Sequence, residues 1–246
     1  MTSAHPSENE AHEPPHGLEF FYAPPQAIGN GFIRIDGDEF VHLSHVMRRT
    51  PGDIIGVADG QGTAYTAEVV TVEKRMAVCK VRTHHPMLHE SPVRVILAAS
   101  LLKNPSRYDF LIEKATEIGV SAIIPLITDR TIPRQARTER WQKLALAAMK
   151  QSGRCVLTPV HEPVTFPVLM ERSASFAAQR WLFHEAAEDS GTVEAGSHMV
   201  IIGPEGGFTD EEVALAVKNS CAAIRLGPRR LRSETAAVAA TARFLL

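Results

Sequence analysis

The sequence lacks several features that would assign the protein to a special class. Its three cysteines lie far apart without paired spacing, which argues against a disulfide scaffold or a cysteine zinc site and predicts a reducing, cytoplasmic setting. No apolar run approaches the roughly 18 residues of a membrane span. The first residues contain neither the basic residues nor the apolar segment of a secretory signal.

A strong charge of one sign is also missing, because 26 Lys and Arg oppose 28 Asp and Glu, for a formal net charge of −2. As an average, this argues against a generic basic nucleic-acid binder. The average hides local differences: residues 1–19 carry four acidic and no basic residues, whereas residues 128–154 carry seven basic and two acidic ones. Residues 225–232 add four arginines. A clustered basic face is typical of nucleic-acid binding, although a solvated helix explains the charge of residues 128–154 about equally well.

The 246 residues correspond to one or two domains. Residues 1–19 are sparse in apolar residues and predict a disordered acidic tail. Residues 20–90 contain short apolar or alternating runs separated by turn signals, as in a small β-barrel, with a short helix at 40–49. Residues 84–92 resemble a linker. From residue 91 onward, apolar strands alternate with helical segments, which predicts an α/β domain with a mainly parallel sheet.

Capping signals and apolar periodicity place the elements of this second domain. Ser106, Thr138 and Ser233 are candidate helix N-caps, and Gly119 and Gly153 are candidate helix ends. Thr209 and Glu212 fit a capping box. The expected strands are 93–101, 122–127, 181–183, 199–202 and 223–226, and the expected helices are 106–119, 138–152, 209–219 and 235–246.

A glycine-rich turn follows the apolar strand at 199–202 and leads directly into a helix. The run from Gly203 to Phe208 reads GPEGGF. Glycines allow backbone N–H groups to approach a ligand, and ligands of open α/β sheets lie beyond the carboxyl ends of the strands. The run matches neither nucleotide fingerprint, and Glu205 would repel a polyphosphate. An uncharged or cationic cofactor fits better, while a plain tight turn remains the alternative.

A second special turn, from Leu226 to Ala236, also joins a short strand to a helix. It contains Arg229, Arg230 and Arg232 just before Ser233 and Glu234. A solvated basic loop would explain the arginines alone. Two such strand-to-helix turns in one domain make an independent coincidence less plausible.

Other polar residues carry weaker signals. Lys103 and Arg107 lie in and just after a predicted loop and are candidates for phosphate contacts. His42 and His45 share a predicted helical face, but no cluster of Cys, Asp or Glu completes a metal site, so no metal is expected. His84, His85 and His89 are predicted to be solvated. No nucleophile elbow of the G-x-S-x-G type is present.

Taken together, the two special turns resemble the SPOUT class of RNA methyltransferases, and more closely the RsmE family of ribosomal small-subunit RNA uridine-N3 methyltransferases. The family pattern is roughly IGPEGGF followed by LGxRILRxETA, and both occur here at fitting separation. The similarity extends over most of residues 20–246. Arg230 stands where the family usually has Ile or Val, and the turn from Asn104 to Ser106 replaces a commoner Gly-Asp type.

The resemblance implies a two-domain fold and a cofactor. It implies a C-terminal α/β domain with a deep trefoil knot over 91–246, a PUA-like RNA-binding β-barrel over 20–90, a homodimer, and S-adenosylmethionine bound in the knot. The methionine sulfonium is cationic, which suits the acidic glycine loop. The implied cofactor contacts are Leu182, Phe183, His184, Glu185, Ile202, Gly203, Pro204, Glu205, Gly206, Gly207, Leu226, Gly227, Leu231, Arg232, Ser233, Glu234 and Thr235.

The implied reaction is methylation of N3 of a specific uridine in 16S ribosomal RNA, with the assembled small subunit as the expected substrate. Arg232 is the first candidate for stabilising the uridinate, Arg229 is the alternative, and Glu234 would orient that arginine, act as the base or simply cap the last helix. Two rivals are a SPOUT 2′-O-ribose methyltransferase and a non-catalytic RNA-binding protein. The candidate RNA contacts are His42, Arg48, Arg49, Lys103, Arg107, Arg130, Arg134, Arg154 and Arg230.

Overall fold

The computed structural model describes residues 17–133, 135–187 and 196–246, and these residues form two compact units. The first unit comprises residues up to Glu90 together with Gly153–Val156, and the second comprises Ser91–Ser152 and Leu157–Leu246. The sequence predicted a single boundary near residue 90, but residues 153–156 also belong to the first unit. Most of the predicted acidic tail, residues 1–16, lies outside the described residues.

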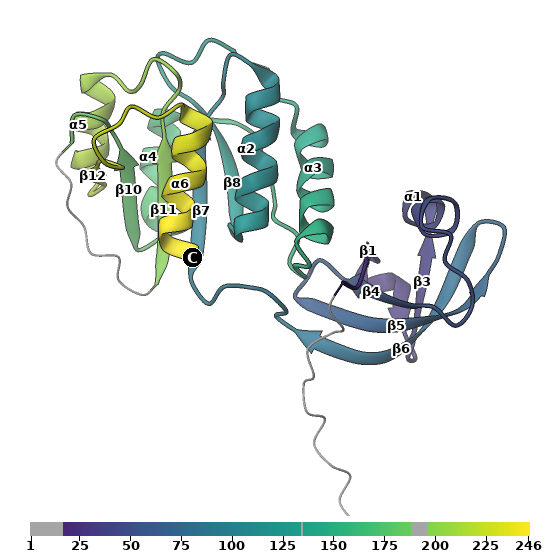
Figure 1. The fold of residues 1–246 in the computed structure, drawn as a ribbon. Helices are drawn as coiled ribbons and strands as arrows, with labels where there is room; N and C mark the ends of the chain where they lie inside the picture. Colours follow the sequence, from purple (N-terminus) through teal and green to yellow (C-terminus); the bar gives the residue numbers. More distant parts are fainter. Residues whose placement is uncertain (1–16, 134, 188–195) are drawn as a thin grey trace, which may run out of the picture. The chain divides into compact units, whose positions relative to one another are not determined.

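The first unit contains a six-stranded sheet in which all neighbours are antiparallel except the first pair (Figure 1). Register shifts after Thr66 and Val69 bend its longest hairpin, as bulges do. The last strand runs to Pro86, so residues 84–86 belong to the sheet and not to a linker. In sheet order the strands are β1 (Phe20–Tyr22), β4 (Ile54–Ala58), β5 (Thr63–Val72), β6 (Met76–Pro86), β3 (Phe32–Asp36) and β2 (Ile28–Gly29).

The helix predicted at 40–49 begins and ends three residues earlier. It consists of α1 (Gly37–Val41) continued by a π-helical turn over His42–Val46. Phe40 and Leu43 are buried in the core of this unit, as their spacing predicts. A short 3-10 turn at Pro25–Ala27 completes the unit. Of the three histidines predicted to be solvated, only His85 is buried, and its ring bonds to two threonine hydroxyls. His84 and His89 are exposed as predicted, although the ring of His89 also bonds to the carbonyl of Gly153.

The second unit is built on a six-stranded, fully parallel sheet, as the alternation of apolar strands and helices predicts. Its order is not sequential, since the first strand lies beside the fifth. The trefoil knot implied by the resemblance stays a prediction. In sheet order the strands are β12 (Ala222–Ile224), β10 (Gln179–Phe183), β11 (Ser197–Ile202), β7 (Arg94–Ser100), β8 (Ala122–Ile127) and β9 (Val164–Thr165).

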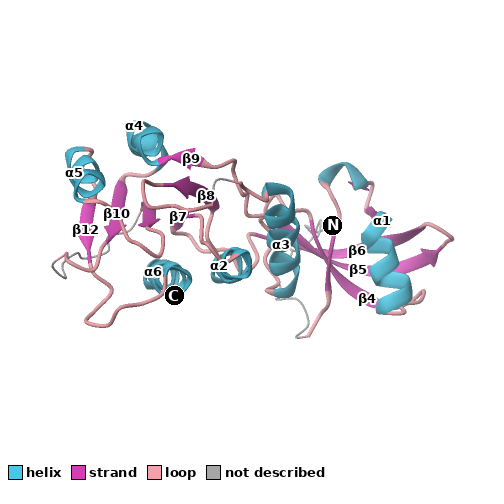
Figure 2. Ribbon diagram, turned by 90° about the horizontal axis from the view of Figure 1, so that it is seen from above, coloured by secondary structure: helices cyan, strands magenta, loops and turns pink. Residues whose placement is uncertain are grey.

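Helices cover both faces of this sheet, and each face buries its own apolar cluster. Figure 2 shows α4 and α5 on one side and α2 and α6 on the other, with α3 beyond α2. The strands therefore alternate side chains between two cores, which explains their continuous apolar runs. The helices are α2 (Pro105–Ile118), α3 (Thr138–Gln151), α4 (Phe166–Phe176), α5 (Asp210–Lys218) and α6 (Ser233–Leu245).

Three predicted caps are wrong by one or two residues, and one helix is missing from the prediction. Asn104, not Ser106, caps α2: its side chain accepts from the N–H of Ser106, because Pro105 takes the first helical position. Thr138 and Ser233 are the first residues of their helices and do not cap them. The α4 helix went unpredicted. The capping box of Thr209 and Glu212 is confirmed, and Gly119 ends α2 in the left-handed conformation.

Candidate cofactor and RNA site

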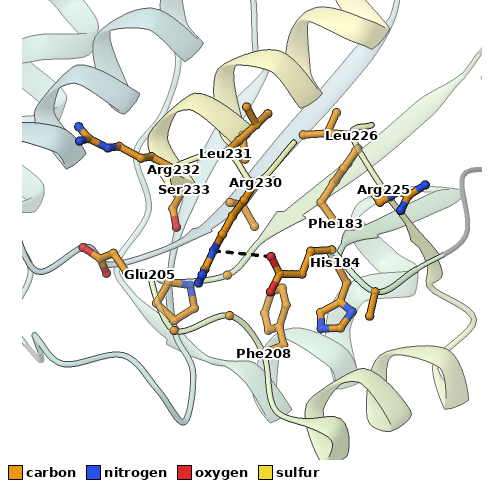
Figure 3. Close-up of a pocket in the computed structure, with 18 of the residues that line it drawn as sticks. Phe183, His184, Glu205, Phe208, Arg225, Leu226, Arg230, Leu231, Arg232 and Ser233 are labelled. Carbon is orange, nitrogen blue, oxygen red and sulfur yellow. Dashed lines mark ion pairs between the residues drawn. The ribbon is translucent and has the colours of Figure 1, made fainter. Parts of the chain in front are cut away.

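Three neighbouring strands of the parallel sheet, β10, β11 and β12, end at one edge, and the loops that follow them enclose a cavity. Their carboxyl ends must meet there because the strands are parallel. The cavity has a volume of about 680 Å³. The loop after Phe183, the glycine loop from Gly203 to Phe208, and the arginine loop from Arg225 to Ser233 line it (Figure 3).

The glycine loop presents backbone to the cavity, and a side chain would be crowded at two of its positions. A Cβ at Gly203 would lie 3.1 Å from the ring of Phe208, and one at Gly206 would lie 3.3 Å from Cβ of Arg130. The N–H of Gly207 donates to the carbonyl of Pro204 at 2.9 Å, and Gly207 has a φ of +69°, which favours glycine. The tight turn predicted from the sequence is present and lies at the cavity wall.

The helix that follows anchors the glycine loop. Phe208 is buried and packs on Phe166, with ring centroids 5.4 Å apart. Glu212 closes the capping box with Thr209 and also accepts from the N–H of Asp129 at 2.9 Å. Hydrogen bonds from its own N–H and from the Thr209 hydroxyl lower the pKa of Glu211 in the same turn. The loop is therefore held at its exit.

Two further segments hold the glycine loop from the other side. Nη1 of Arg130 donates to the carbonyls of Gly206 at 2.8 Å and Phe208 at 3.2 Å. Oε1 of Glu205 accepts from the N–H of Lys103 at 3.0 Å. These contacts join residues 76 to 102 positions apart in the sequence, and they make Arg130 a structural support of the loop as well as a lining residue.

The arginine loop lines the opposite wall. Arg229, Arg230 and Arg232 all contribute to the cavity lining. Nε of Arg230 lies 3.6 Å from Oε2 of Glu185, dashed in Figure 3, but both side chains are largely exposed and such pairs contribute little to stability. Figure 3 shows the guanidinium of Arg232 directed away from His184 and Phe208. The wall therefore carries positive charge while the glycine loop carries the carboxylate of Glu205.

The start of α6 lies beneath this wall. Ser233 lines the cavity, whereas Glu234 is 7% exposed and does not. Oε1 of Glu234 lies 3.6 Å from Nε of Arg107, and its Oε2 is buried without a hydrogen-bond partner. Glu234 therefore faces Arg107, a residue of α2, and not the cavity.

Residues 89–245 match the family model of an RNA methyltransferase domain, and residues 35–82 match that of an RNA methyltransferase PUA domain. The chain belongs to the ribosomal RNA small subunit methyltransferase E family. It is 33% identical to the Mycobacterium bovis protein of that name, over 84% of this chain and 83% of that one. It is 30% identical to the Bacillus subtilis protein, over 82% and 85%.

A solved structure of the family supports the same placement. The Neisseria gonorrhoeae small subunit methyltransferase E, bound to S-adenosylmethionine, is 32% identical, with a TM-score of 0.83 over 92% of this chain and 96% of that one. A putative Legionella pneumophila methyltransferase with the same bound cofactor is 26% identical, also with a TM-score of 0.83. The predicted α/β fold with an N-terminal PUA-like unit is thereby confirmed.

The residues that line the cavity in this chain fit S-adenosylmethionine, the methyl donor bound in the related structures. Two glycines at which a Cβ would be crowded leave a backbone surface that an adenosine or methionine moiety could approach. The carboxylate of Glu205 lies at the wall and complements a cationic sulfonium or ammonium group. A triphosphate would instead meet this carboxylate and the acidic first turn of α5.

Most of the cofactor contacts implied by the resemblance lie together in this cavity. Leu182 is wholly buried in the core, Glu234 faces Arg107, and Thr235 is exposed outside the lining. The predicted residues that do line it are Phe183, His184, Glu185, Ile202, Gly203, Pro204, Glu205, Gly206, Gly207, Leu226, Gly227, Leu231, Arg232 and Ser233. The lining also includes Pro228, which lies within the predicted stretch 226–235, and Ala186, Phe208, Arg225 and Ala236, which the sequence analysis missed although Phe208 directly follows the glycine pair.

The predicted RNA contacts fall into separate groups. Lys103, Arg107 and Arg130 line a second hollow beside the glycine loop. His42, Arg48 and Arg49 belong to the first unit, where Arg48 is exposed and has a φ of +52°. Arg134 lies outside the described residues. Arg230 lines the cofactor cavity.

Arg154 is wrong as an RNA contact. Its side chain is 3% exposed, and its Nη2 lies 2.6 Å from Oε2 of Glu90, which is itself buried. Burial of an arginine requires such a partner, and the sequence showed no link between two residues 64 positions apart. Arg154 therefore stabilises the first unit.

Within the part of the chain that the structure describes, no helix is long and apolar enough to cross a membrane. Among those same residues, no group of three or more His, Cys, Asp or Glu side chains is arranged to hold a metal ion.

Proposed function

We propose that this protein transfers a methyl group from S-adenosylmethionine to N3 of a uridine in 16S ribosomal RNA. The observation that carries the proposal is one cavity with two different walls, a backbone-lined acidic glycine loop and a loop with three arginines. The first wall suits a cationic methyl donor, and the second suits an RNA base with its phosphates. Membership of the family supplies the class of reaction.

The chain's main chemical task is to make N3 nucleophilic. Uridine N3 carries a proton, so methylation requires its loss, and the resulting negative charge spreads onto the two carbonyl oxygens beside it. Bound S-adenosylmethionine supplies an electrophilic methyl group on sulfur. Arg232, or alternatively Arg229, is proposed to stabilise the uridinate as an oxyanion donor does, and the loops orient the base for in-line attack.

Glu234 is proposed to act through an arginine and not as the general base. Its carboxylate lies outside the cavity lining and faces Arg107 at 3.6 Å. A general base has to come within hydrogen-bond reach of the proton that it removes. The released proton is therefore expected to pass to solvent.

The proposed setting is the bacterial cytoplasm, with a homodimer acting on the assembled small subunit. The PUA-like first unit, which carries His42, Arg48 and Arg49, is proposed to bind RNA beside the target. Lys103, Arg107, Arg130 and Arg230 would contact RNA at the site itself. Arg134 remains part of this proposal. A trefoil knot would bring the three cofactor loops together.

The deciding experiment is methyl transfer from labelled S-adenosylmethionine into assembled small subunits and into naked 16S RNA, followed by nucleoside mapping. We expect 3-methyluridine at a single position, and more of it on the assembled subunit. A 2′-O-methyl nucleoside would instead identify a ribose methyltransferase. Calorimetry without any cofactor binding would identify a non-catalytic RNA-binding protein.

Arg232→Ala tests the residue assignment. We expect it to reduce methyl transfer by about 100-fold, the usual cost of one oxyanion donor, because the charge on the uridinate loses its partner. The dissociation constant for S-adenosylmethionine should stay close to that of the unmodified protein in calorimetry. Turnover at the original rate in this variant would contradict the assignment and direct attention to Arg229.

A further inference from the structure

The second hollow adjoins the cofactor cavity. It has a volume of about 640 Å³ and lies between the start of α2 and the glycine loop. Arg107, Arg130, Glu205 and Gly206 line both spaces, so the two spaces share a wall. Methyl transfer requires the acceptor to lie directly beside the methyl donor, and this hollow is a space that meets that requirement.

The lining of the hollow combines cationic and apolar groups. Lys103 and Arg107 supply charge for a phosphate or a carbonyl oxygen, and Arg130 is already engaged with the carbonyls of the glycine loop. Ile132 is 69% exposed at the rim, where a flat base can cover it. Cationic groups beside an exposed apolar side chain are what we expect of a pocket that binds one nucleotide flipped out of its base stack.

Arg107 is held in place by a buried carboxylate. Its side chain is 35% exposed, while that of Glu234 is 9% exposed and has one oxygen without a hydrogen-bond partner. A carboxylate is costly to bury unless a cation faces it, so the pair restricts the guanidinium. The contact involves Nε, and the guanidinium has two further nitrogens to present to a ligand.

We propose that this hollow is the subsite of the target uridine and that Arg107, held by Glu234, is a catalytic residue that donates to a carbonyl oxygen beside N3. The proposal rests on the proposed function and deepens it. Arg107 lines the hollow and serves one carbonyl oxygen of the uracil, whereas Arg232 lines only the adjoining cofactor cavity and would reach the other oxygen from there. The N3 proton passes to solvent, the electron pair left on N3 forms the bond to the methyl carbon, and the carbon–sulfur bond breaks with its pair on sulfur.

The test measures single-turnover methyl transfer into assembled small subunits as a function of pH. For Arg107→Ala we expect a rate about 100-fold lower at neutral pH. We also expect the pH–rate profile to move about one unit to higher pH, because loss of the cation disfavours the uridinate. Arg107→Lys retains the charge opposite Glu234 and should recover part of the rate, and it remains informative if the alanine variant fails to fold.

Glu234→Gln tests the positioning role. It keeps the shape of the side chain but removes its charge, and we expect a roughly 10-fold lower rate with cofactor affinity changed by less than about 3-fold. In an Arg107→Ala background, Glu234→Gln should cost nothing further, since a residue that acts through another is not additive with it. Lys218→Ala and Glu171→Gln, at exposed positions of α5 and α4, serve as matched controls and should behave as the unmodified protein.

Three outcomes would overturn the proposal. Weaker RNA binding with an unchanged rate and pH profile in Arg107→Ala would make Arg107 a phosphate contact only. An undiminished effect of Glu234→Gln in the Arg107→Ala background would make Glu234 a structural residue. If the unmodified protein forms no methyluridine at all, the proposed function itself fails. If it forms methyluridine but Arg107→Ala keeps the rate and pH profile, only the present proposal fails, so the two failures are distinguishable.

Discussion

Single glycines determine how closely a ligand can approach the backbone at the cofactor cavity. Gly203 adopts an ordinary backbone conformation, so its role is one of space: the ring of Phe208 lies 3.1 Å from the position that its Cβ would take. Phe208 in turn packs on Phe166 and is buried. A methyl group here therefore requires the ring or the glycine loop to shift slightly.

Gly203→Ala should weaken S-adenosylmethionine binding by about 10-fold, because overpacking of this kind costs about 1–3 kcal/mol. Calorimetric titration of the variant measures the effect. Gly29→Ala is the control, since no atom lies within 4 Å of its added Cβ. Equal affinity in Gly203→Ala and the unmodified protein would mean that the cofactor does not contact this turn.

The three cysteines are all buried and unpaired in disulfides. Loss of solvation raises the pKa of Cys79 to about 12, and burial together with the charge of Glu90 raises that of Cys155 to about 11. Burial also raises the pKa of Cys221. Because the thiolate is the reactive form, native protein at pH 8 should carry almost none of it.

We expect no measurable alkylation of these thiols by iodoacetamide at pH 8 in the native state, and three alkylated sites after unfolding in urea. Mass spectrometry counts the adducts. Rapid labelling of native Cys155 would show that the segment containing it opens in solution.

At the scale of elements, four residues between α3 and β9, Gly153–Val156, belong to the first unit, although the residues on both sides of them belong to the second. Glu90 accepts from the N–H groups of Cys155 at 3.0 Å and Val156 at 2.9 Å while its other oxygen faces Arg154. The N–H of Gly62 donates to the carbonyl of Cys155. One buried carboxylate thus satisfies two backbone donors and one guanidinium.

Glu90→Ala should destabilise the protein by about 3–5 kcal/mol, the usual cost of leaving one member of a buried ion pair without its partner. Urea unfolding followed by circular dichroism measures the change. The exposed pair of Arg82 and Glu68 provides the control, and Arg82→Ala should cost less than about 1 kcal/mol. Similar losses in both variants would refute a special role for Glu90.

At the scale of the whole molecule, many basic side chains gather around the glycine loop. The two spaces beside the glycine loop are lined by Lys103, Arg107, Arg130 and the arginines of residues 225–232. The formal net charge of −2 says nothing about this arrangement. RNA binding should therefore be strong at low salt and should depend on a small number of phosphate contacts.

The affinity for a 16S RNA fragment that contains the methylated uridine should fall by about 10- to 100-fold between 50 and 200 mM salt, as expected for roughly four neutralised phosphates. Filter binding or fluorescence anisotropy at several salt concentrations gives the slope. Replacement of Lys103 with alanine should reduce that slope by about one unit, the contribution of one phosphate contact. An affinity that does not change with salt would exclude phosphate binding at this surface.

The sequence by itself determined the parts of the site that are contiguous in the chain. The GPEGGF turn and the arginine loop each follow an apolar strand and precede a helix, and these local signals correctly placed both at the end of a parallel sheet. The capping box of α5 was predicted for the same reason, because both partners lie within one turn. The sequence also carried the family resemblance.

Only the tertiary structure decided the contacts between distant residues. No periodicity could pair Arg154 with Glu90, Arg107 with Glu234, or Lys103 with Glu205, since each pair is separated by at least 64 residues. Arg154, predicted as an RNA contact, is buried against Glu90, and Glu234, predicted as a candidate base or helix cap, lies beside Arg107. Local propensity acts over a few residues, whereas burial and charge pairing depend on where the chain returns.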